Sequence, residues 1–160
     1  MFNLSFPENV YTGKELSAAK ELVEQGQKHD LVIEGKDDFE KKVEEALELI
    51  KTAGYYDYLR TYIRKIMEID GMTQLRQEEV TIWANKFAVE NPIDAASLFI
   101  QKAHHMQEYI EGKLYYGGAA EQRSIAKRVE FLQSLKGKTE DSKVKEECTR
   151  LLEQWKDNSF

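Results

Sequence analysis

Hydrophobic residues recur along most of the chain with the spacing of an amphipathic helix. Between Asp37 and Gly54 they recur every three or four positions, with one adjacent pair, and form one stripe, made of Phe39, Val43, Ala46, Leu47, Ile50 and Ala53. Gly54 stands where the left-handed residue that ends a helix is favoured. The pattern therefore predicts a helix over residues 37–53, with Asp37 or Asp38 as its N-cap.

Similar stripes predict helices in most of the remaining sequence. They cover residues 12–29, 55–69, 73–91, 92–116, 125–136 and 140–155. Thr12, Thr73 and Thr139 are candidate N-caps for three of these helices, and Pro92 suits the first turn of a fourth. Gly137 is expected to end the helix that precedes it.

Two segments have a different pattern. Phe2, Leu4 and Phe6 alternate with polar residues as in a short strand, so residues 1–11 are expected to be extended or loop. Residues 30–36 contain a β-branched run closed by Gly35, which is expected either to pair with the N-terminal segment or to form a plain linker.

These patterns predict an all-α fold in a single helical domain, residues 1–160. Short connections favour an antiparallel bundle of about seven helices with a short N-terminal extended segment. Three helical hairpins, as in a repeat solenoid, are a second arrangement that the spacing allows. Because the hairpins share no repeating residues, an irregular single-core bundle is favoured, with Trp83, Phe87, Phe99 and Leu151 in its core.

Composition narrows the class of protein. The chain has 160 residues, 41% of them hydrophobic, and a formal net charge of -6, which argues against disorder and against strong nucleic-acid binding. Residues 1–80 carry 17 acids and 11 bases, whereas residues 81–160 carry 12 of each. Cys148 is the one cysteine, and neither a membrane span nor a leader peptide is apparent, so a cytoplasmic protein is expected.

One group of residues has metal-binding chemistry. On a helix, His104, His105 and Glu108 lie near one another, and imidazole nitrogens with a carboxylate can bind a divalent metal. The segment lacks the His-Glu-x-x-His spacing of zinc peptidases and the Glu-x-x-His pairs of di-iron bundles, since position 101 is Gln101. Half-buried histidines without a metal are the alternative interpretation, and it is favoured.

Aromatic and basic residues suggest contact surfaces. Arg60 and Arg64 are interleaved with tyrosines, a composition that nucleic-acid surfaces share with ordinary helix packing. Tyr115 and Tyr116 precede a glycine pair and are expected to form an interaction surface, in a homodimer or with another protein. Acids between Asp37 and Glu48 are interpreted as a solvated helix face.

No phosphate loop, nucleophile elbow or paired cysteine and histidine occurs in the sequence. We therefore expect a non-catalytic cytoplasmic protein that acts through protein–protein interaction with an unidentified partner and needs no cofactor. A metal-dependent helical-bundle enzyme or metal-binding protein that uses His104, His105 and Glu108 is the alternative.

Overall fold

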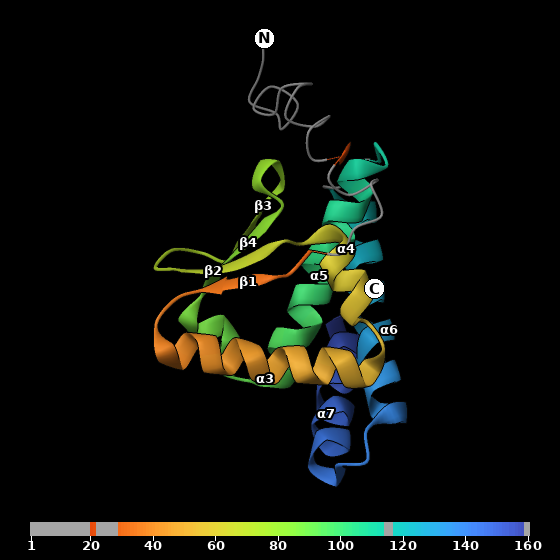
Figure 1. Cartoon of the computed structure of the whole chain (residues 1–160). Helices are drawn as coiled ribbons and strands as arrows, with labels where there is room; N and C mark the ends of the chain where they lie inside the picture. The colour runs from red at the N-terminus through yellow and green to blue at the C-terminus, as the bar shows by residue number, and fades with distance from the viewer. Residues whose placement is uncertain (1–19, 22–28, 114–116, 159–160) are drawn as a thin grey trace.

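A four-stranded mixed sheet packs beside helices in the computed structural model, which describes residues 20–21, 29–113 and 117–158 (Figure 1). Its strand order is β1-β2-β4-β3, where β1 and β2 are parallel, β2 and β4 are parallel, and β3 and β4 are antiparallel. The strands are β1 (Val32–Glu34), β2 (Lys65–Ile69), β3 (Gln74–Arg76) and β4 (Thr81–Asn85).

Five α-helices and two 3-10 turns complete the described elements. The helices are α3 (Asp37–Ala53), α4 (Tyr56–Tyr62), α5 (Pro92–Ile110), α6 (Gly118–Lys138) and α7 (Ser142–Asn158), and the 3-10 turns are Gln77–Glu79 and Lys86–Val89. α3 and α4 connect β1 to β2, and α5, α6 and α7 follow the sheet in the chain.

The all-α prediction is wrong, because two segments expected to be helices contain three of the four strands. The expected helix over 55–69 ends at Tyr62 and continues as β2, and the one over 73–91 is replaced by β3, β4 and the two 3-10 turns. In β2 the buried Ile66 and the half-buried Ile69 are three residues apart, a spacing that a helix stripe also shows. β4 lies between two other strands and buries Thr81, Ile82 and Ala84, so it lacks the alternation of a half-exposed strand.

One apolar row crosses all four strands and joins the sheet to the helices. The strand pairing places Ile33, Ile66, Ile82 and Leu75 side by side on one face. Ile66 and Ile82 are fully buried, whereas Ile33 and Leu75 at the two edges are partly buried against the same core. Phe99, Ile100 and Val43 from α5 and α3 belong to this hydrophobic cluster, so the row faces the helices.

The predicted helix over 37–53 is confirmed as α3, and its apolar stripe is buried as expected. Gly54 follows it in the left-handed conformation with φ 84°. Pro92 begins α5, and the side chain of Asn91 accepts from the N–H groups of Ile93 and Asp94. Asp141, and not Thr139, accepts from the first N–H groups of α7.

Several local predictions need correction. Gly137 lies inside α6 and does not end it. Val32–Glu34 of the expected extended segment forms β1 and pairs with β2, not with the N-terminal segment. Phe99 and Leu151 are buried as predicted, but Phe87 is 66% exposed and Trp83 is half-buried on the other face of the sheet, under Arg76. Residues 1–11, most of the helix expected over 12–29, Tyr115 and Tyr116 lie outside the described residues.

In the part of the chain that the structure describes, no helix combines the length and the apolar character that crossing a bilayer requires.

Candidate functional site

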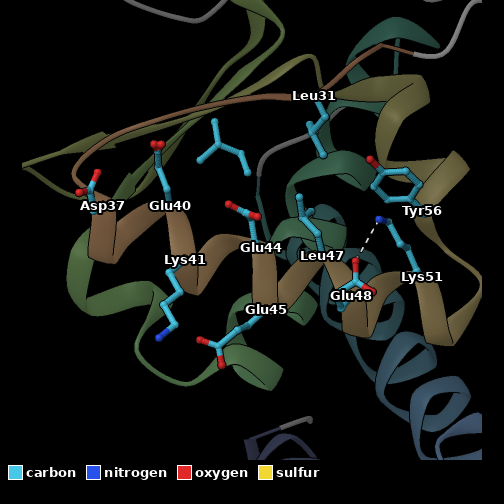
Figure 2. A pocket seen from close by; sticks show the side chains of 11 residues that line it. Leu31, Asp37, Glu40, Lys41, Glu44, Glu45, Leu47, Glu48, Lys51 and Tyr56 are labelled. Atoms are coloured by element: carbon cyan, nitrogen blue, oxygen red, sulfur yellow. Dashed lines mark hydrogen bonds and ion pairs between the residues drawn. The ribbon is translucent and has the colours of Figure 1, made fainter.

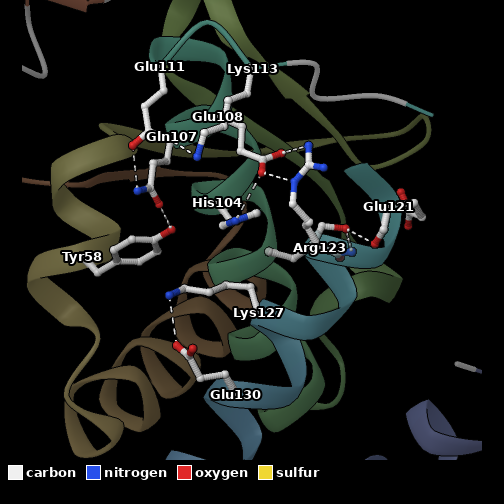
Figure 3. Close-up of polar contacts among 12 residues, drawn as sticks. Tyr58, His104, Gln107, Glu108, Glu111, Lys113, Glu121, Arg123, Lys127 and Glu130 are labelled. Carbon is white, nitrogen blue, oxygen red and sulfur yellow. Dashed lines mark hydrogen bonds and ion pairs between the residues drawn. The ribbon is translucent and has the colours of Figure 1, made fainter. Parts of the chain in front are cut away.

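The carboxylate of Glu108 lies between α5 and α6 and is bound on both of its oxygens (Figure 3). Arg123 on α6 donates from Nε to Oε2 at 2.6 Å and from Nη2 to Oε1 at 3.2 Å. One turn earlier on α5, Nε2 of His104 lies 3.7 Å from the same Oε2. Because only 3% of the Glu108 side chain is exposed, Arg123 supplies the charge that compensates a buried carboxylate.

The two histidines are neutral at neutral pH. Burial lowers the pKa of His104, and burial with the charge of Lys102 lowers the pKa of His105 to about 4. Nδ1 of His104 and Nε2 of His105 are buried without a hydrogen-bond partner among the described residues. A neutral imidazole nitrogen can bind a metal, but the nearest carboxylate is already occupied by Arg123.

Metal binding at His104, His105 and Glu108 stays a prediction. Within residues 29–113 and 117–158, no three His, Cys, Asp or Glu side chains are grouped so that they could hold a metal ion. The structure therefore assigns Glu108 an ion pair and adds no further ligand. Metal analysis of protein purified without a histidine tag is the direct test.

Gln101 belongs to a buried polar network and not to a ligand set. Its side-chain oxygen accepts from Nη1 of Arg128 at 3.0 Å, and its Nε2 donates to Oγ of Ser124 at 3.1 Å. Where a zinc-peptidase helix has His-Glu-x-x-His, α5 has Gln101, Lys102 and His105. The segment thus has the amide of Gln101 in place of a histidine ligand, and the ammonium group of Lys102 in place of the glutamate that acts as general base.

Arg128 is the centre of that network. It donates to Asp94 Oδ1 at 2.7 Å and to Ser97 Oγ at 2.8 Å, and 8% of its side chain is exposed. Asp94, Ser97 and Gln101 lie three and four residues apart on α5, so they share the face that meets α6. In the sequence these three residues form a polar stripe at helical spacing, and this stripe was not among the predicted sites.

The predicted arginine surface has a structural role. Nε of Arg60 donates to the carbonyl of His29 at 2.7 Å, and Nε of Arg64 donates to the carbonyl of Glu79 at 2.7 Å. These contacts hold the chain before β1 and before β4. Tyr115 and Tyr116, which complete the predicted interaction surface, are not among the described residues. The interaction surface, with Arg60 and Arg64, stays a prediction.

The tyrosines near these arginines pack against α5 and α6. Tyr58 makes edge-to-face contacts with Tyr55 and Tyr62, and its hydroxyl donates to Oε1 of Gln107 at 2.7 Å. The hydroxyl of Tyr55 donates to Glu130 on α6. These rings form contacts between α4 and the helices α5 and α6.

A groove lies between β1 and α3 (Figure 2). It has a volume of about 660 Å³, and Leu31, Ile33, Leu47 and Tyr56 form its apolar part. Figure 2 shows Leu31 directed down from the β1 side toward Leu47, and Glu40 and Glu44 directed up from α3. The groove therefore has an apolar interior with carboxylates along one side.

We name these acids the acidic row, made of Asp37, Glu40, Glu44, Glu45 and Glu48. Lys41 and Lys51 are the two bases in the same lining, and Nζ of Lys51 lies 3.0 Å from Oε2 of Glu48. Glu44 and Glu45 have no ion pair among the described contacts. The sequence showed these acids as a solvated helix face, but it gave no indication that a strand lies opposite them.

Comparison with protein-family models, with curated proteins and with solved structures finds no match for this chain.

Proposed function

We propose that this chain is a non-catalytic α/β interaction domain that binds another protein at the groove between β1 and α3. The observation that carries the proposal is the groove itself, whose apolar residues Leu31, Ile33 and Leu47 lie beside the acidic row. Contact surfaces combine an apolar centre with a polar rim, and the groove has this composition.

Three side chains buried elsewhere in the described residues, those of Glu108, Arg128 and Cys148, favour a binding role over a catalytic one. Glu108 is paired with Arg123, and Arg128 is paired with Asp94. Burial raises the pKa of the Cys148 thiol to about 11, so the reactive thiolate is scarce at neutral pH. Each group is thus kept in a state suited to packing.

We further propose a cytoplasmic location and assembly as a homodimer. The location is supported by the chain's one cysteine, which is buried and free and so fits a reducing compartment. The homodimer is supported by the aromatic pair Tyr115 and Tyr116 in the sequence and by the frequency of two-fold assemblies.

Site-specific photo-crosslinking tests the binding site. A photoreactive amino acid placed at Glu44, in the groove, is expected to give a discrete adduct with a partner protein in the source cell. The matched position is Glu153, an exposed residue on α7. The identified partner, purified, should bind the parent chain and the Glu153→Lys variant alike, and the Glu44→Lys variant about tenfold more weakly. Adducts at both positions in equal yield, or none at Glu44, would overturn the groove as the site.

A further inference from the structure

We propose that the partner segment is an extended chain with lysine or arginine at alternate positions, which pairs with the open edge of β1 as an added strand. This inference rests on the proposed interaction function and specifies its ligand. It is drawn from three features of the described residues: the free backbone groups of β1, the hollows on its two faces, and the spacing of the acidic row.

The outer edge of β1 offers backbone hydrogen bonds. β1 is the first strand in the order β1-β2-β4-β3, and the N–H of Val32 donates toward β2, to the carbonyl of Arg64 at 3.0 Å. Successive strand residues direct these groups to opposite sides, so the N–H and C=O of Ile33 point away from β2. No described strand pairs with β1 on that side. An extended peptide can therefore add to the sheet at Ile33.

Hollows lie on both faces of this edge. The groove of about 660 Å³ includes Leu31 and Ile33, and a second hollow of about 380 Å³ includes Val32, Glu34 and Lys65. Side chains of an added strand alternate between the two faces of the sheet. Every second side chain would therefore enter the groove, and the side chains between them would lie over Val32, which is 51% exposed.

The acidic row matches the repeat of such a strand. Glu40, Glu44 and Glu48 are four residues apart on α3, which places successive carboxylates about 6 Å apart along the helix axis. Alternate side chains of a strand are about 6.6 Å apart. Bases at every second position of the segment can thus meet successive carboxylates without a change of register.

Charge selects a basic segment over a second copy of this chain. The groove lining has five acids and two bases, and the whole chain has a net charge of -6. A second copy would bring its own acidic row to the same edge, and like charges would oppose pairing there. An alternating basic segment instead places its positive charges beside Glu44 and Glu45, which carry no ion pair in the described contacts.

Synthetic peptides test the inference with the full chain. The peptide Lys-Thr-Lys-Thr-Lys is compared with its isomer Thr-Lys-Lys-Lys-Thr, which has the same charge, by fluorescence anisotropy at about 150 mM salt. The alternating peptide is expected to bind at least about tenfold more tightly. Glu44→Lys is expected to weaken its binding about tenfold, and Glu153→Lys to leave it unchanged. Equal binding of the two isomers would overturn the inference.

Backbone pairing has its own readout. Binding of the alternating peptide should slow hydrogen exchange at the amide of Ile33, and a backbone N-methylated form of the peptide, which keeps the side chains but loses the N–H donors, should bind poorly. Binding without protection at Ile33 would overturn strand addition. If crosslinking at the groove succeeds but the captured segment is helical or acidic, the proposed function stands and this inference fails. If neither peptide binds and no adduct forms at the groove, both the proposed function and this inference fail.

Discussion

Asp94 supplies the negative charge that compensates the buried guanidinium of Arg128. Its Oδ1 accepts from Arg128 at 2.7 Å, and the Arg128 side chain is 8% exposed. We expect Asp94→Ala to lower the free energy of unfolding by about 3 kcal/mol, because it leaves a buried guanidinium without its counter-charge. Asp57→Ala is the matched control, since Asp57 also lies in a first helical turn but is 76% exposed, and it should change stability by less than about 0.5 kcal/mol. Urea denaturation measures both, and equal effects would contradict the network's role.

His105 should make the protein less stable in mild acid. Burial, with the nearby charge of Lys102, lowers its pKa from the ordinary value of 6.5 to about 4 in the folded state. A lowered histidine pKa means that the unfolded chain takes up the proton first. The stability is therefore complete above pH 6.5 and decreases as the pH falls from 6.5 toward 4, by up to about 3 kcal/mol.

The His105→Gln variant isolates this contribution from the titration of carboxyl groups. We expect the difference in unfolding free energy between pH 7 and pH 4.5 to be smaller in the variant than in the parent protein. Urea denaturation at the two pH values provides the comparison. An identical pH dependence of stability in both proteins would contradict a lowered pKa of His105 in the folded state.

Phe87 and Phe99 occupy opposite environments although both follow an apparent helix stripe. Phe99 is fully buried on α5, and Phe87 is 66% exposed in the 3-10 turn Lys86–Val89. We expect Phe99→Ala to lower the free energy of unfolding by about 3 kcal/mol and Phe87→Ala to change it by less than about 0.5 kcal/mol. Thermal melts of the two variants measure this difference. A larger loss of stability in Phe87→Ala than in Phe99→Ala would indicate that residues 73–91 form the helix that the sequence suggested.

Gly54 and Gly137 both lie near the C-terminus of a helix, Gly54 just after α3 and Gly137 in the last turn of α6. Gly54 ends α3 with φ +84°, and a Cβ there would lie 3.0 Å from Nζ of Lys138. Gly137 is inside α6, and a Cβ there meets nothing within 4 Å. We expect Gly54→Ala to destabilise the protein by about 1 kcal/mol and Gly137→Ala to stabilise it by about 0.5 kcal/mol. Chemical denaturation should show changes in unfolding free energy of opposite sign in the two variants. Changes of the same sign would contradict the left-handed conformation of Gly54 or the helical conformation of Gly137.

The helices could be predicted and the sheet could not, for reasons visible in particular segments. α3 and α5 are long, each buries one periodic stripe, and local residues such as Gly54 and Asn91 mark their ends. β2 and β4 are five residues each, and β4 buries the adjacent residues Thr81 and Ile82 on opposite faces of the sheet, so its buried residues follow no alternation. Strand pairing joins residues far apart in the chain, such as Ile33 and Ile66, and a local pattern does not contain that information.

At the scale of the whole molecule, the candidate groove depends on this long-range pairing. The sequence shows the acids of α3, but β1 faces them only because it pairs with β2 beyond α4. The local pattern therefore pointed to His104, His105 and Glu108, which are near one another on one helix and whose metal binding stays a prediction. It did not point to a surface built from two elements.

At the scale of the whole molecule, two surfaces are candidates for self-association. The sequence predicts a homodimer through Tyr115 and Tyr116. The described residues offer another apolar corner, where Met72 and Phe87 are 84% and 66% exposed. Asn85 braces this corner, since its side chain donates to the carbonyls of Asp70 and Gly71 and accepts from the N–H of Phe87.

Light scattering at micromolar concentration is expected to give the mass of a dimer for the parent protein, because closed two-fold pairs are the commonest assembly and aromatic residues are enriched at contact surfaces. The double variant Tyr115→Ser, Tyr116→Ser is expected to be monomeric with an unchanged circular dichroism spectrum. The matched double variant Met72→Ser, Phe87→Ser should remain dimeric. If the second variant is monomeric and the first is not, the interface lies at the Asn85 corner; a monomeric parent protein contradicts the homodimer itself.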